Sequence, residues 1–133
     1  MATLAEILAQ ARQLHQAGDL GRAEQLYRQV RQADPANGEV AYLLGMTCHQ
    51  GGRLEEAATH YREALRLKPD YATAHFNLGL ALVAQGKTVE ANPHFSEAAR
   101  LKPELAAQID RALNSYRASP STHRSPGLGS KHD

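Results

Sequence analysis

A period of 34 residues runs through most of this chain. Four kinds of residue recur at this step: a proline, a glycine, an alanine and a ring side chain. They are Pro35, Pro69 and Pro103; Gly18, Gly52 and Gly86; Ala23, Ala57 and Ala91; and Tyr27, Tyr61 and Phe95. A period of this size is typical of arrays in which each repeat buries its apolar face only against its neighbours. The sequence therefore predicts one structural repeat written three times.

Composition argues against several classes of partner. The chain has 133 residues, of which 42% are hydrophobic, and a formal net charge of +1. Because the charges nearly cancel, there is no strong field to attract a phosphate backbone or an anionic membrane. We therefore expect no nucleic acid and no membrane among the partners. No apolar run resembling a signal peptide or a membrane span follows Met1, so a cytoplasmic location is expected.

Each repeat is predicted to contain two helices. Apolar residues recur at three- and four-residue steps, and no stretch alternates with a period of two. In the second repeat, one helix is expected over about 39–49 and another over about 54–68. Pro69 should end the second of these helices because it lacks a backbone donor.

Two local signals concern the starts of helices. Thr3 and Glu6 have the spacing of a capping box, which predicts that the first helix begins at Leu4. Pro93 lies where the second helix of the third repeat should begin, and it lacks the amide that a helix starting near residue 88 would use. We therefore expect this helix to start late or distorted, near Asn92, with Pro93 at its first position.

The spaced small and large residues resemble the tetratricopeptide repeat family. With repeats at 4–37, 38–71 and 72–105, the third carries the family pattern at His75, Leu78, Gly79, Leu82, Gly86, Ala91, Phe95, Ala98 and Pro103. The second matches at Leu44, Gly45, Cys48, Gly52, Ala57, Tyr61, Ala64 and Pro69. The first is looser, since Gln10 replaces the leucine and Val30 replaces the second alanine. The resemblance implies an all-α fold, a right-handed α-solenoid of three helix-turn-helix repeats.

The residues after Pro103 do not begin a fourth repeat. An apolar stripe on a helix over about 104–117 comprises Leu105, Ile109, Ala112, Leu113 and Tyr116. Such a helix would cap the last apolar face of the array, so the repeat domain is expected over 4–117. The segment 118–133 is rich in serine, proline and glycine, and we expect it to be disordered.

The resemblance also implies where a partner binds, because the first helices of successive repeats line a concave groove in this family. The expected groove residues are Leu8, Arg12, His15, Tyr42, Leu43, Met46, His49, Phe76, Asn77, Leu80 and Val83. The remaining groove-facing positions of the three repeats hold Ala5, Ala9, Gln16, Glu39, Gln50, Thr73 and Ala84. Most are apolar, which favours an apolar helix or an extended segment of a partner protein as ligand. The alternative is that several of these side chains pack inside the array.

Known ligand-binding patterns of the family narrow this expectation. Its chaperone-binding members hold a terminal carboxylate with a clamp of lysines, asparagines and an arginine. The clamp is absent here, where the matching positions hold Leu8, Arg12, Leu43, Thr73 and Asn77. Asn77 resembles the asparagine that holds peptide backbones in the O-linked N-acetylglucosamine transferase array. Leu43 and Ala9 interrupt such a ladder, which favours an isolated polar residue at Asn77.

No metal, cofactor or catalytic activity is predicted. His15 and His49 occupy equivalent positions about 10 Å apart, too far for a shared zinc ion. Cys48, the single cysteine, adjoins His49, but neighbouring helix positions point about 100° apart. No cysteine partner is expected for the remaining helix-borne histidines, His60, His75 and His94. The chain also lacks a nucleophile elbow and a phosphate-binding glycine loop.

Three hypotheses for function remain open at this stage. The leading one is a protein-interaction scaffold that binds a peptide or helix of a partner in its groove. The alternative is the N-terminal substrate-recognition array of a larger bacterial transferase, of the glycosyltransferase kind, which extension of the reading frame beyond Asp133 would indicate. The third is weak self-association into a homo-oligomer, which light scattering would detect.

Overall fold

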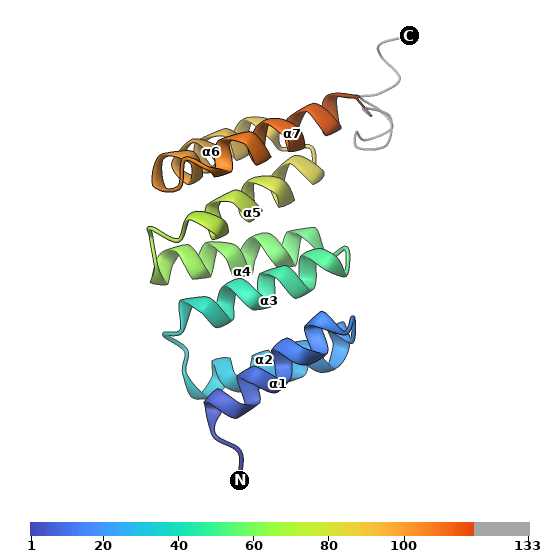
Figure 1. Ribbon diagram of the computed structural model, residues 1–133, viewed down its shortest axis with the longest axis vertical. Coiled ribbons are helices and arrows are strands. Elements are labelled where there is room, and N and C mark those ends of the chain that lie inside the picture. The colour runs from blue at the N-terminus through green and yellow to red at the C-terminus, as the bar shows by residue number, and fades with distance from the viewer. Residues whose placement is uncertain (119–133) are drawn as a thin grey trace. The chain divides into compact units, whose positions relative to one another are not determined.

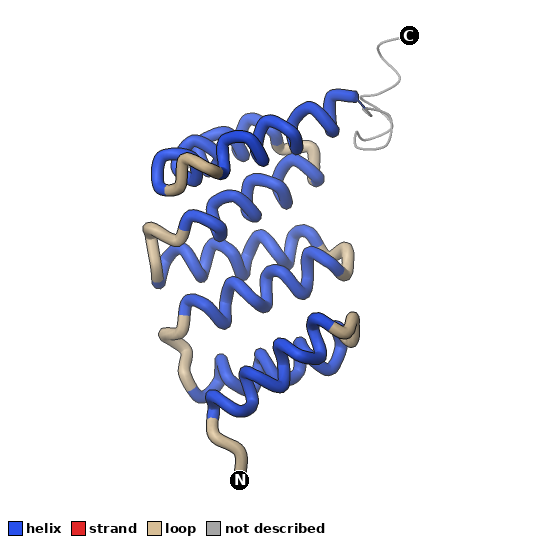
Figure 2. Tube along the Cα trace, viewed as in Figure 1, coloured by secondary structure: helices blue, strands red, loops and turns tan. Residues whose placement is uncertain are grey.

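The computed structural model describes residues 1–118, and within them it contains seven helices and no strand (Figure 2). The helices are α1 (Leu4–Gln16), α2 (Leu20–Ala33), α3 (Gly38–Gln50), α4 (Leu54–Leu67), α5 (Ala72–Ala84), α6 (Thr88–Leu101) and α7 (Leu105–Ala118). The predicted all-α fold of helix-turn-helix repeats is confirmed. The tail expected to be disordered lies, apart from Ala118, outside the described residues.

The helices group into two compact units, Met1–Pro69 and a second that begins at Asp70. In the first unit, α1 packs on α2, α3 packs on α4, and α2 contacts α3 (Figure 1). In the second unit, α5 packs on α6, and α7 contacts both. The first unit thus contains two helical hairpins, and the second contains one hairpin with an additional helix.

The turn within each hairpin explains why a glycine recurs in every repeat. Gly18, Gly52 and Gly86 have φ angles of 87°, 81° and 82°. Residues that carry a side chain rarely adopt these left-handed backbone angles, whereas glycine does so without a steric penalty. The turn geometry therefore requires the glycine at this position of the repeat.

One of the two predictions on helix starts is confirmed. The Thr3 hydroxyl accepts from the amide of Glu6 at 3.1 Å, and the Glu6 carboxylate accepts from the amide of Thr3 at 2.8 Å. This capping box begins α1 at Leu4, as expected.

The expected late start at Pro93 is wrong, because α6 begins at Thr88 and contains Pro93. Ala91 and Phe95, which flank this proline, are buried at 0% and 4% exposure, so packing holds the segment in helical register. The missing donor leaves the carbonyl of Val89 without its helical partner. Since Val89 is 84% exposed, water can bind that carbonyl.

Within the second hairpin, and likewise within the third, close contact between a ring and a glycine holds the two helices together. A Cβ atom on Gly45 would lie 2.6 Å from the Tyr61 ring, and one on Gly79 would lie 2.5 Å from the Phe95 ring. Both distances are far shorter than van der Waals contact, so neither position accepts a side chain unless the ring moves. In the first hairpin the buried Ala11 takes this place beside α2.

The apolar stripe expected on α7 faces the second unit. Leu105 and Ile109 are buried at 5% and 7% exposure. Because α7 contacts both α5 and α6, it covers apolar surface of the hairpin that these two helices form, as a terminal helix of a repeat array does.

Candidate functional site

A cleft of about 400 Å³ lies in the first unit, and most of its lining residues belong to α1 and α3. Its lining side chains come from these two helices and from one residue of α2. They are Arg12, His15, Gln16, Tyr27, Leu43, Met46 and Gln50. Four of the expected groove residues therefore meet in one cleft: Arg12, His15, Leu43 and Met46. The two glutamines also lie there.

Hydrogen bonds hold His15 in the cleft from both sides. Its Nδ1 lies 3.0 Å from the hydroxyl of Tyr27, and its Nε2 lies 2.6 Å from Oε1 of Gln50. Because a carbonyl oxygen only accepts, Nε2 donates to Gln50, and in the neutral ring Nδ1 accepts from Tyr27. His15 thereby links three helices of the first unit, α1, α2 and α3. The orientation of its ring is set before any ligand arrives.

The charged groups of the cleft are more exposed. Arg12 of α1 donates to the carboxylate of Glu39 on α3, and the two side chains are 44% and 48% exposed. Exposed ion pairs contribute little to stability, about 0–1 kcal/mol, because water competes for both partners. The guanidinium of Arg12 can therefore exchange Glu39 for another carboxylate at small cost.

The apolar side of the cleft borders the core of the first unit. Leu43 is half-buried and packs on a core cluster that includes Ala11, Tyr27 and Leu44. Leu8 packs on the same cluster, so its contacts are mainly structural. Met46 is half-buried and lines the cleft together with Leu43.

Two other expected groove residues of the first unit contact Tyr61 instead of lining this cleft. The Tyr42 ring lies 5.8 Å from the Tyr61 ring. Nδ1 of His49 lies 3.2 Å from the Tyr61 hydroxyl. Burial raises the pKa of Tyr61 and lowers the pKa of His49, so both groups are neutral at physiological pH.

The expected groove residues of the second unit differ in burial. Phe76, Asn77 and Leu80 are half-buried on α5, and the Phe76 ring lies 6.2 Å from Phe95. Val83 is only 4% exposed, so its side chain belongs to the core of that unit.

The role of Tyr27 in the cleft was not predicted from the sequence. The repeat pattern predicts a ring that fills the core, and the side chain is indeed fully buried, but its hydroxyl reaches His15. The signal was present in the sequence, since His15 and Tyr27 recur 34 residues later as His49 and Tyr61. A pair of polar residues that repeats together indicates a contact.

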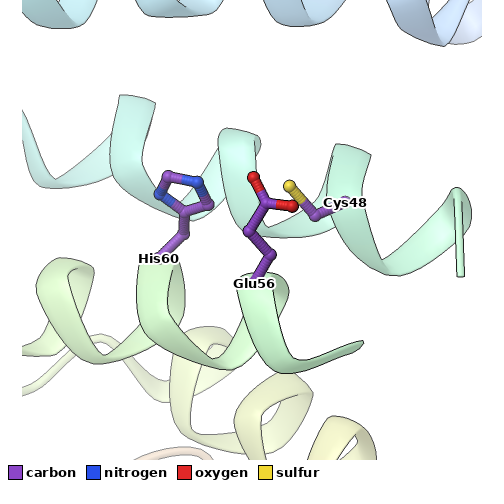
Figure 3. A group of neighbouring side chains, drawn as sticks. All are labelled: Cys48, Glu56 and His60. Carbon is purple, nitrogen blue, oxygen red and sulfur yellow. The ribbon is translucent and has the colours of Figure 1, made fainter. Parts of the chain in front are cut away.

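A second group of side chains lies between α3 and α4 (Figure 3). Cys48 of α3 and the two α4 residues Glu56 and His60 each offer one donor atom, and these atoms lie within 4.8 Å of one another. Cys48 and His60 are buried, and Glu56 is exposed. The expectation that His60 has no cysteine partner is therefore wrong. The antiparallel hairpin brings together residues 12 positions apart in the sequence, which spacing on a single helix does not reveal.

Arginines surround this group. Arg28 and Arg53 lie 3.3 Å and 3.1 Å from the Glu56 carboxylate. The same two arginines lie 2.6 Å and 2.5 Å from Glu24, and the hydrogen bond from Arg53 is the main reason why the pKa of Glu24 falls to about 2.

The imidazole and the thiol of this group are held in their neutral forms. Nη1 of Arg31 lies 3.1 Å from Nδ1 of His60, so it donates to that nitrogen. Burial lowers the pKa of His60 and raises the pKa of the Cys48 thiol, because a charged form loses hydration there.

The second unit holds a pair of histidines between α5 and α6. The rings of His75 and His94 stack at 5.6 Å, and their Nδ1 atoms are 3.3 Å apart. This separation fits a hydrogen bond in which one neutral ring donates to the other.

Comparison with known proteins identifies the repeats. Residues 45–86 match the family described as TPR repeat, and residues 8–29 match the family described as Tetratricopeptide repeat. The chain is a tetratricopeptide repeat protein. Its repeats therefore support the general role of a scaffold for interactions between proteins.

Solved structures share this tetratricopeptide repeat fold. A mutant of the O-GlcNAc transferase from Thermobaculum terrenum matches over 77% of this chain with 32% identity and a TM-score of 0.72. This chain spans only 21% of that transferase. A mutant of MamA matches over 74% of this chain and 72% of its own length, with 27% identity and a TM-score of 0.69. No curated protein matches the chain.

A further MamA structure extends the likeness of fold. It covers 89% of this tetratricopeptide repeat protein and 69% of its own length, with a TM-score of 0.79. At 18% identity this match concerns the fold alone.

Among the described residues, no helix has both the length and the apolar character that crossing a membrane requires.

Proposed function

We propose that the chain binds a peptide or helix of a partner protein in the cleft beside α1 and α3. The observation that carries this proposal is that four of the expected groove residues line one open cleft of about 400 Å³. This volume lies within the range of roughly 300–1,000 Å³ that ligand pockets occupy. The cleft is therefore large enough for one or two side chains of an incoming segment.

The chemistry of the cleft favours a segment that combines an apolar side chain with a carboxylate. Leu43 and Met46 offer an apolar wall, and the flexible thioether of methionine adapts to different shapes. Arg12 is exposed and can accept a new carboxylate in place of Glu39. His15 is already oriented by its two hydrogen bonds, so little entropy is lost at this residue on binding.

The test is selection of peptides from a displayed random library on the immobilised chain. A selected peptide is then titrated by calorimetry into the wild type, into Met46→Ala and into Arg12→Ala. Each variant should weaken binding about fivefold or more, which corresponds to about 1 kcal/mol. The control is Val89→Ser, because Val89 is highly exposed on α6 and lies outside this cleft.

The result of that titration decides between surfaces. The proposal is contradicted if the peptide binds Met46→Ala and Arg12→Ala as tightly as it binds the wild type and the Val89→Ser control. Binding would then lie outside the cleft. Circular dichroism of each variant verifies that helicity is retained.

One observation favours a second candidate function, a substrate-recognition array within a larger transferase. The match to the O-GlcNAc transferase covers 77% of this chain but only 21% of that enzyme. An array of this kind would hold a protein substrate in the same cleft while a separate catalytic domain acts on it. A transferase domain encoded in frame with these repeats would support this candidate, and a gene that ends with them would contradict it.

A further inference from the structure

We propose that Cys48, Glu56 and His60 form a binding site for one zinc ion, with water as the fourth ligand. The three donor atoms are a sulfur, a carboxylate oxygen and a ring nitrogen, and they lie within 4.8 Å of one another (Figure 3). Thiolate sulfur, imidazole nitrogen and carboxylate oxygen each bind zinc in proteins, and a site with three protein ligands leaves the fourth position to water. The inference concerns a site separate from the cleft, so it does not depend on the proposed function.

The geometry requires only small movements. Ligand atoms on a tetrahedral zinc ion lie about 2.0–2.3 Å from the metal, and thus roughly 3.5 Å from one another. The Glu56 side chain can rotate towards the other two donors, because its carboxylate is exposed and not confined by burial. The sulfur and the imidazole are held in place by the packing of α3 on α4.

The spacing of the ligands suits a rigid site. Glu56 and His60 are four residues apart on α4, so their side chains lie on the same face of that helix. Cys48 projects from α3, the other helix of the hairpin. On binding zinc the thiol would release its proton to solvent, and the thiolate would offset part of the charge of the ion in this buried place.

The surrounding arginines can give up the ligands without losing all their partners. Arg28 and Arg53 both hold Glu24 in addition to Glu56, so neither is left unpaired when Glu56 turns to a metal. Arg31, which now donates to His60, lies 3.9 Å from the carboxylate of Glu63. Zinc would thus displace guanidinium groups that have a second carboxylate within reach.

The repeats supply an internal contrast. At the positions of Cys48, Glu56 and His60, the third repeat has a leucine, a glutamate and a histidine, and the first repeat has a leucine, an arginine and a leucine. The complete donor set occurs only in the second repeat. His94, the third-repeat counterpart of His60, is therefore a matched control.

The experiment is titration of the chelator-treated, reduced chain with cobalt(II), which replaces zinc and is visible by absorption. We expect one cobalt ion per chain, a thiolate-to-cobalt charge-transfer band in the near ultraviolet, and visible bands typical of tetrahedral coordination. Addition of zinc should remove these bands. Cys48→Ser should abolish the charge-transfer band, and Glu56→Gln and His60→Gln should each weaken cobalt binding at least tenfold.

The matched control is His94, the third-repeat counterpart of His60. His94→Gln should bind cobalt as the wild type does. The proposal is overturned if the wild type shows no charge-transfer band, if the band persists in Cys48→Ser, or if His94→Gln weakens binding as much as His60→Gln. Because Glu56 is exposed, Glu56→Gln tests the site even if a buried variant fails to fold.

Discussion

The second and third repeats build the same hairpin with different chemistry at its centre. In the second, the ring of Tyr61 carries a hydroxyl that lies 3.2 Å from Nδ1 of His49. In the third, Phe95 takes the place of the tyrosine and Val83 takes the place of the histidine, so this polar contact has no counterpart. His49 is half-buried, whereas Val83 is only 4% exposed.

The difference teaches which part of the repeat pattern the fold needs. Tyr61 and Phe95 both lie against a glycine, Gly45 in one hairpin and Gly79 in the other. Each ring also packs beside a ring of the first helix of its repeat. The ring centroids are 5.8 Å apart for Tyr61 and Tyr42, and 6.2 Å apart for Phe95 and Phe76. The stability of each hairpin therefore depends on the buried ring and on the glycine that leaves space for it. The Tyr61 hydroxyl is not needed for this packing, but once buried it requires a hydrogen-bond partner, which His49 provides.

The largest effect expected from this comparison is loss of the ring itself. Tyr61→Ala and Phe95→Ala should each lower the free energy of unfolding by about 3–5 kcal/mol, because each leaves a cavity between two helices. Chemical denaturation followed by circular dichroism measures both values. A cost below about 1 kcal/mol for either variant would show that the hairpin tolerates an empty centre and would break the comparison.

An intermediate effect is expected when the polar group is placed in the wrong repeat. Phe95→Tyr should cost about 1–3 kcal/mol, because the new hydroxyl is buried and the position of its histidine partner in the second repeat holds Val83 here. The double variant Phe95→Tyr with Val83→His should recover part of that loss by recreating the contact of the second repeat.

The reverse change serves as the control for this prediction. Tyr61→Phe leaves His49 half-buried and able to bind water, so it should cost about 1 kcal/mol or less. A double-mutant cycle in which Val83→His adds to the loss of Phe95→Tyr would contradict the interpretation.

The smallest effect concerns the ion pairs that link the first repeat to the second. Glu24→Gln should lower the free energy of unfolding by about 1 kcal/mol at pH 7, because Glu24 holds Arg28 and Arg53. Folding lowers the pKa of Glu24 from 4.5 to about 2. The contribution of this carboxylate is therefore fully present above pH 4.5 and is lost as the pH falls towards 2.

Denaturation of wild type and Glu24→Gln across this pH range measures the difference directly. The two proteins should converge in stability near pH 2. A difference that stays constant from pH 7 to pH 2 would show that the loss arises from packing and not from the charge. The second repeat has Ala58 at this position, so Ala58→Gly provides no comparable dependence on pH and serves as a control.

Much of the fold could be predicted from particular residues. Thr3 and Glu6 specify the start of α1 because the capping box is a local interaction. The recurring glycines specify the turns because the turn needs a residue with a positive φ angle, which glycine adopts without steric penalty. The start of α6 could not be predicted in this way, because the burial of Ala91 and Phe95 outweighs the local preference of Pro93.

The candidate sites divide along the same line. Arg12, His15, Leu43 and Met46 were expected in a groove because the repeat sets which helix face they occupy, and they do line one cleft. The participation of Tyr27 and the meeting of Cys48 with His60 were not expected. Both depend on how far side chains reach across two packed helices, which periodicity along the chain does not contain.

The sequence by itself determined the repeat length, the helical hairpins and their turns, because each follows from backbone conformation or from apolar periodicity. Tertiary structure alone decided which polar side chains meet: His15 with Tyr27 and Gln50, and Cys48 with Glu56 and His60. The physical reason is that hydrogen bonds and metal ligation act over about 2–3 Å. Positions on different helices come within that range only after the helices have packed.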